Sequence, residues 1–187
     1  MLHKLRKATV RPAREKLHGK VEVDDTYVGG KEEDVVGRPV ETKTPVAVEV
    51  RGRASGRVRL RALPDVSAAS LLPFVQETVI PGTVVYTDGW RGYARIGSRG
   101  FNHRVRPMNA GQDSSRVLPR VHRAISNLKS WLQGTHHGVS PKHLQPYLDE
   151  YAFRFNRRRT PMAAFQTILG IGSQVPTVTY KRLCDSE

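Results

Sequence analysis

Acidic residues occupy two segments of the sequence that otherwise have the pattern of buried β-strands. Asp24 and Asp25 interrupt the apolar run VEVDDTYVGG at positions 21 to 30, and Asp88 closes the run VVYTD. A carboxylate in a core strand is costly unless it is hydrogen-bonded, paired or bound to a metal ion. Carboxylate oxygens suit hard cations such as Mg²⁺, and two such ions can hold the attacking and leaving oxygens of a phosphoryl transfer. The pattern therefore predicts a divalent-metal site, although Asp followed by Gly at positions 88 and 89 is also a common turn dipeptide.

A third group for this site is expected on a helix that begins near Pro119. Polar side chains recur along it at helical spacing, at His122, Ser126, Lys129 and Gln133. The 3.6-residue period places these four on one stripe. His122 could then act as a metal ligand or proton acceptor, and Lys129 could hold a phosphate. A solvated helix face with a surface histidine explains the same periodicity equally well.

The elements that must position these residues follow from the hydrophobic pattern. Strands are expected at 21–28, 45–50, 57–63 (an edge strand), 82–90 and 103–106, and helices at 67–80, 119–133 and from 140 onward. Ser140 is expected to be the N-cap of the last helix, with Pro141 at its first position. Consecutive strands followed by alternating helix and strand predict an α/β fold in which a mixed sheet is covered by helices.

The charge balance indicates the kind of partner. The 187 residues carry a formal net charge of +14, which favours a polyanion, and nucleic acid is the leading candidate. The single cysteine, Cys184, supports neither a disulfide scaffold nor a structural zinc site. No apolar run approaches the roughly 20 residues that span a bilayer. We expect a soluble intracellular protein with no membrane partner.

Three stretches carry a family resemblance: VEVDDTYVGG, VYTDGWRGY and GTHHGVSPKHLQPYLDEYAFRFNRRR. The chain resembles the catalytic domain of bacterial insertion-sequence transposases of the DDE type, within the group whose domains read VEVDETYVGG, TDGWRGY and GTHHGVSPKHLQ. The resemblance runs from about residue 19 to about residue 170. It implies a ribonuclease H-like fold, with a mixed five-stranded sheet and helices on both faces. It also implies metal-dependent DNA strand cleavage and strand transfer with Mg²⁺ or Mn²⁺, two ions being expected.

The resemblance assigns roles residue by residue. The first and second catalytic aspartates of the family fall on Asp24 and Asp88, and the family's third acid falls on His122, with the group's additional lysine at Lys129. The histidine departs from the usual glutamate, makes the site less negative and suits Mn²⁺ better than Mg²⁺. His122 could also serve as general base on the attacking water. Asp25, where relatives carry Glu, is expected to lie outside the metal site.

Several other residues are candidates for DNA contact. Trp90 and Arg91 directly follow Asp88 and could contact DNA near the cut, although core packing explains an aromatic residue there as well. Arg157 and Arg158 belong to a basic helix end that could contact phosphates, or could simply be a solvated cationic C-terminus. His136, His137 and His143 match no standard zinc spacing.

The resemblance also implies an organisation and partners. We expect a basic N-terminal arm at 1–19, the catalytic domain at 20–170 and a tail at 171–187. Relatives carry an N-terminal DNA-binding region, which suggests a truncated copy here. The expected partners are double-stranded DNA, as transposon ends and target, and further copies of the chain on that DNA, in the bacterial cytoplasm with the nucleoid. A ribonuclease H-like nuclease or resolvase, and an inactive DNA-binding remnant, are the alternatives.

Overall fold

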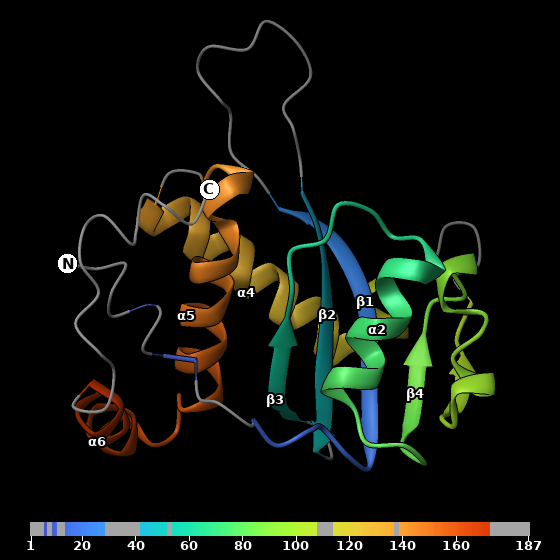
Figure 1. Cartoon of the computed structure of the whole chain (residues 1–187), viewed down its shortest axis with the longest axis horizontal. Helices are drawn as coiled ribbons and strands as arrows, with labels where there is room; N and C mark the ends of the chain where they lie inside the picture. Colours follow the sequence, from blue (N-terminus) through green and yellow to red (C-terminus); the bar gives the residue numbers. More distant parts are fainter. Residues whose placement is uncertain are drawn as a thin grey trace, which may run out of the picture.

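The computed structural model describes residues 6, 9–10, 14–28, 42–51, 54–107, 114–136 and 139–172. Within these ranges five strands form one mixed sheet in the order β3-β2-β1-β4-β5 (Figure 1). The strands are β1 (Lys20–Val28), β2 (Thr42–Arg51), β3 (Ala54–Leu60), β4 (Val84–Thr87) and β5 (Asn102–Val105). β2 is antiparallel to β1 and β3, whereas β4 is parallel to β1 and β5. β1 is therefore the central strand, and the predicted mixed α/β fold is confirmed.

Helices connect and cover these strands. α2 (Ala68–Thr78) links β3 to β4, and the short 3₁₀ turns η1 (Arg91–Tyr93) and η2 (Gly97–Arg99) link β4 to β5. After β5 come α3 (Ser114–Val117), α4 (Pro119–His136), η3 (Pro141–His143), α5 (Leu144–Asn156) and α6 (Pro161–Gly172). No helix in the described ranges is both long enough and apolar enough to cross a membrane.

The sheet has an apolar core on each face. α2 covers one face, where it packs against Val21, Val23 and Val85. α4 and α5 cover the other face, where they pack against Val58 and Leu60 (Figure 1). The helix predicted at 119–133 from the hydrophobic pattern is confirmed as α4, and its buried residues lie at helical spacing: Val121, Ala124, Ile125, Leu128 and Leu132.

The start of α5 differs from the sequence expectation. Ser140 is not the N-cap, because residues 141–143 form a 3₁₀ turn and the α-helix begins at Leu144 with His143 as its N-cap. The position of Pro146 agrees with this later start. Proline has no N–H and its ring clashes with the carbonyl four residues earlier, which disfavours it beyond the first turn of a helix, although α2 accommodates Pro73 in its interior. A helix beginning at Leu144 places Pro146 in that first turn.

Other element boundaries were also wrong by several residues. β3 begins at Ala54 and ends at Leu60, three residues before each predicted limit, and β2 extends the prediction at both ends. Within the predicted N-terminal arm, Leu17 is wholly buried and bonds to the strand-like segment after α2 through Thr78 O and the Ile80 N–H. α6 was not expected at all, and it crosses the predicted boundary at residue 170.

The edge strand β3 is covered by side chains of α5 and of the residues that follow it. Asn156 accepts a hydrogen bond from Val58 N at 2.7 Å and donates one to Val58 O at 3.2 Å. Gln145 accepts one from Ala62 N at 2.9 Å, and Arg158 donates to Ser55 O. The bonds to Val58 and Ser55 pair β3 backbone groups that another strand would otherwise have to satisfy, and the bond to Ala62 continues this cover just past the end of β3.

Candidate functional site

The pairing of β1 with β4 brings the two candidate acids to one place. The parallel register pairs Val21 with Val85 and Glu22 with Tyr86. Continuing this register by two residues sets Asp24 beside Asp88, the first residue after β4. Neighbouring strands lie about 4.8 Å apart. The register thus places two aspartates that are 64 positions apart in the sequence on neighbouring chain segments at the end of β4.

Strand alternation separates the adjacent acids Asp24 and Asp25. Asp24 faces α4, where its Oδ2 lies 3.5 Å from Nε2 of His122. Asp25 faces the other side of the sheet, where its Oδ1 accepts a hydrogen bond of 3.4 Å from the hydroxyl of Tyr93. The structure thus joins Asp24 with His122, and places Asp25 in the layer beneath α2.

The pKa of Tyr93 reflects the negative charge that gathers at this end of the sheet. Its side chain is wholly buried. Burial raises the pKa of the Tyr93 hydroxyl well above its usual value, and the charges of Asp25, Asp24 and Asp88 raise that pKa further. Three carboxylates act on one phenol, so the cluster would gain from a cation that neutralises part of their charge.

Backbone amides orient both candidate ligands. Oδ1 of Asp24 accepts a hydrogen bond from Asp25 N at 2.8 Å, and Oδ1 of Asp88 accepts one from Trp90 N at 2.9 Å. The second bond is an Asx turn, so the turn interpretation of Asp88 is also correct. It is completed by Gly89, whose φ of 98° is in the region that favours glycine. The turn and a ligand role are compatible, because a carboxylate has two oxygens.

The donor set suits a hard or borderline divalent cation. Asp24 and Asp88 supply the carboxylate oxygens that Mg²⁺ and Mn²⁺ prefer, and His122 supplies an imidazole nitrogen, which suits Mn²⁺ better than Mg²⁺. In the part of the chain that the structure describes, no three His, Cys, Asp or Glu side chains already converge as a metal centre. A cation would therefore have to draw these three groups together.

The remaining predicted residues lie at different distances from this site. On the polar stripe of α4, Lys129 is exposed, and seven residues of helix put it about 10 Å beyond His122 along the axis. Trp90 is 48% exposed, although its indole N–H donates to Val66 O at 3.0 Å. Arg91 is exposed next to it. Trp90 and Arg91 thus lie on the surface beside Asp88.

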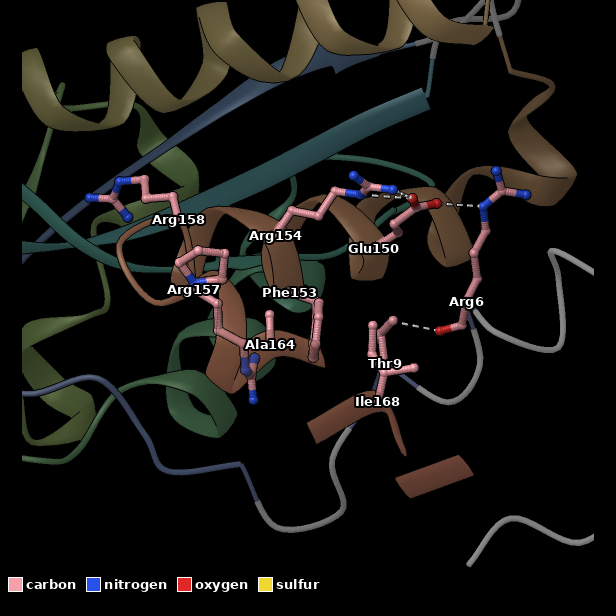
Figure 2. A pocket seen from close by; sticks show the side chains of 10 residues that line it. Arg6, Thr9, Glu150, Phe153, Arg154, Arg157, Arg158, Ala164 and Ile168 are labelled. Atoms are coloured by element: carbon pink, nitrogen blue, oxygen red, sulfur yellow. Dashed lines mark hydrogen bonds and ion pairs between the residues drawn. The ribbon is translucent and has the colours of Figure 1, made fainter. Parts of the chain in front are cut away.

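Arg157 and Arg158 belong to a different surface. They line a pocket of about 380 Å³ between α5, α6 and the N-terminal segment (Figure 2). The Arg157 guanidinium lies 4.1 Å from the centre of the Phe153 ring, and Arg158 donates to backbone carbonyls at the end of α5 and in β3. Both arginines follow α5, which covers β3. Because β3 is two strands away from β1 in the sheet, the arginines lie away from Asp24.

The histidines of the third motif have separate surroundings. The His136 ring packs against Trp131 and Tyr147, with ring centres 4.8 and 4.7 Å apart. His143 is the exposed N-cap of α5, and His137 lies outside the described residues. The described contacts therefore give His136 an aromatic packing role.

Sequence reasoning missed one acid on the site face. Glu22 is 1% exposed and lies two residues before Asp24, on the same side of β1. Its carboxylate accepts hydrogen bonds from the first turn of α4. The signal was present in the sequence, because alternation places an acid at position 22 on the same face as the acid at position 24.

The family model and the curated relative that match this chain are of one kind. The family model of the ISXO2-like transposase domain matches residues 16–156. An uncharacterized transposase-like protein of Haemophilus influenzae is 30% identical over 95 residues, which cover 50% of this chain and 76% of that protein. The structural comparison found a pre-cleavage Mos1 transpososome, with 16% identity and a TM-score of 0.32 over 91% of this chain. The chain spans 59% of the length of that transpososome chain.

Proposed function

Because the chain belongs to the ISXO2-like transposase domain family, whose members act in transposition, we propose that it cuts and joins DNA with the help of divalent metal ions. The proposed chemistry is hydrolysis at the ends of an insertion sequence, followed by attack of the new 3′-hydroxyl on target DNA. The observation that carries the proposal is the contact of Asp24 with His122 at 3.5 Å, together with the β1–β4 register, which places Asp88 next to Asp24 when it is continued by two residues. The strand order, with β2 alone antiparallel to the central strand, supports a ribonuclease H-like fold.

In this proposal each residue has a chemical task. Asp24 and Asp88 hold two Mg²⁺ or Mn²⁺ ions, with each Oδ1 kept in place by a backbone N–H. When bound, such ions activate the attacking oxygen and stabilise the leaving oxygen. His122 either completes the ligand set or accepts the proton of the attacking water, and Asp24 orients its imidazole in both cases.

The proposed partner is double-stranded DNA, bound by more than one copy of the chain. Trp90 and Arg91 are exposed beside Asp88 and would contact the DNA near the cut. Lys129 is exposed about 10 Å beyond His122 along α4 and would hold a phosphate there. Arg157 and Arg158 would contact phosphates further away. The net charge of +14 supports strong phosphate binding, so affinity should fall steeply with salt concentration.

Cleavage of DNA that carries the inverted repeats flanking the gene tests the proposal. With Mg²⁺ or Mn²⁺ present, Asp24→Asn and Asp88→Asn should each lose at least about 100-fold in strand cleavage and transfer, since each removes a charged ligand. Asp25→Asn is the matched control, and should lose less than about tenfold because Asp25 faces the other layer. Full activity in Asp88→Asn would refute the proposed site.

Two further outcomes separate the alternatives. A wild-type chain that binds these repeats without cleaving them in either metal would be a DNA-binding remnant, and one that cleaves branched DNA without recognising the repeats would be a nuclease or resolvase. The role of His122 can be read from metal preference. If His122 is a ligand, His122→Asp should shift activity from Mn²⁺ toward Mg²⁺, because an oxygen donor replaces nitrogen.

A further inference from the structure

β1 carries a buried carboxylate that the proposed chemistry does not use. Glu22 is 1% exposed and lies on the face of β1 that meets α4. We propose that Glu22 is the positioning residue that fixes α4 against β1, and thereby holds His122 opposite Asp24. The inference rests on the proposed function for its catalytic consequence, but its structural content can be tested separately.

The contacts of Glu22 account for the first turn of α4. The first four N–H positions of a helix have no partner within the helix. Pro119 has no N–H, and His122 N bonds to Leu118 O at 3.1 Å. The two amides between them, those of Arg120 and Val121, donate to Oε2 of Glu22 at 2.7 and 3.0 Å. Glu22 therefore acts as the cap of α4, although it belongs to a strand 98 positions earlier.

The charge of Glu22 is compensated at the same place. Its Oε1 lies 3.4 Å from the guanidinium of Arg120, and the N-terminus of α4 adds a partial positive charge. An isolated buried carboxylate would be expensive, whereas an apolar side chain of similar size would fill a core at less cost. A charged residue at this position is explained by the two amides of the first turn of α4 that it holds in place.

The geometry links this cap directly to the candidate site. Glu22 and Asp24 are two residues apart on one face of β1, a spacing of about 7 Å. Arg120 and His122 are two residues apart on α4, a rise of about 3 Å. Glu22 binds the amide of Arg120, and Asp24 lies 3.5 Å from His122 two residues further along α4. A shift of α4 relative to Glu22 would therefore also change the distance between Asp24 and His122. A misplacement of about 1 Å can cost about 100-fold in rate.

Two conservative substitutions separate position from charge. Glu22→Gln keeps the side-chain length and an oxygen that can accept both amides, but removes the charge. Glu22→Asp keeps the charge and shortens the side chain by one carbon–carbon bond, about 1.5 Å. If Glu22 positions α4, Glu22→Gln should retain strand cleavage within about tenfold and Glu22→Asp should lose about 100-fold in kcat, with DNA affinity unchanged. Glu77→Gln, at an exposed glutamate of α2, is the matched control.

A distance measurement tests the inference without reference to DNA chemistry. Spin labels at Ser130→Cys on α4 and Arg104→Cys on β5, in a Cys184→Ser background, report how α4 lies on the sheet, and both labelled positions are exposed. We expect one narrow distance distribution in wild type and Glu22→Gln, and a shifted or broadened one in Glu22→Asp. Amide hydrogen exchange at Val121 should accelerate in Glu22→Asp alone.

The outcomes distinguish this inference from the proposed function. An unchanged distance and unchanged Val121 exchange in Glu22→Asp would overturn the inference, whatever the activity. Loss of activity in Glu22→Gln as large as in Glu22→Asp would show that charge, not position, is what matters, and would also overturn it. If wild type itself fails to cleave DNA while Glu22→Asp still shifts α4, the positioning role stands and the proposed function fails.

Discussion

Removal of the Asn156 side chain should destabilise the protein by about 2–4 kcal/mol. Asn156 makes two hydrogen bonds to the backbone of Val58 on the edge strand β3. The bond to Val58 O contributes about 1 kcal/mol net, and the Val58 N–H left without its acceptor costs about 1–3 kcal/mol. The side chain of Val58 is wholly buried, so in Asn156→Ala water cannot readily replace the lost partner of the Val58 N–H.

The assay is urea denaturation followed by the fluorescence of Trp131, which packs against Tyr151 in the same core. The midpoint should fall while the slope with urea stays constant, since the surface exposed on unfolding is unchanged. Asn127→Ala, at an exposed position of α4, is the matched control and should change stability by no more than about 0.5 kcal/mol. A loss below about 1 kcal/mol in Asn156→Ala would refute the view that α5 closes the edge of the sheet through this side chain.

Two further predictions concern pH. Hydrogen bonds from Arg6 and Arg154 outweigh burial and lower the pKa of Glu150 below its ordinary 4.5, so Glu150→Gln should cost roughly 1–3 kcal/mol at pH 7, an effect that should disappear as the pH falls below 4.5. Equal losses at pH 7 and pH 3 in urea denaturation would contradict this. Burial lowers the pKa of His103 below 6.5, so the unfolded chain binds its proton more tightly and stability should decline as the pH falls through 6.5. His103→Gln should remove that part of the pH dependence.

Periodicity and turn chemistry predicted the elements better than their ends. The stripe from Val121 to Leu132 is buried as expected, since apolar residues at helical spacing must cover a core. Ser140 and Pro141 have the residue types of a helix start, but the α-helix begins at Leu144, which places Pro146 in its first turn. Proline is disfavoured deeper in a helix, although α2 accommodates Pro73.

The candidate site was predictable only in part. Spacing indicated Asp24 or Asp25, Asp88 and His122, but alternation alone could not choose between the adjacent acids. The choice depends on which face of β1 meets α4, and that is a tertiary contact. The cap formed by Glu22 joins groups 98 positions apart, and no local pattern contains such a contact. The same holds for the bonds of Asn156 to β3.

The alternation of acids and valines along β1 also decides between two ways of pairing this strand. Because two aspartates are adjacent, β1 could pair with its neighbours one residue out of register, with Asp25 in the place of Asp24. Such a shift would turn every side chain of β1 to the opposite face of the sheet. After such a slip, Glu22 and Asp24 would enter the apolar layer beneath α2, and Val21 and Val23 would meet the first turn of α4. The amides now held by Glu22 would lose their acceptor, and two carboxylates would be buried without partners, each at a cost of several kcal/mol. The mispaired strand is thereby excluded during folding, and only one of the two aspartates can become the acid of the site.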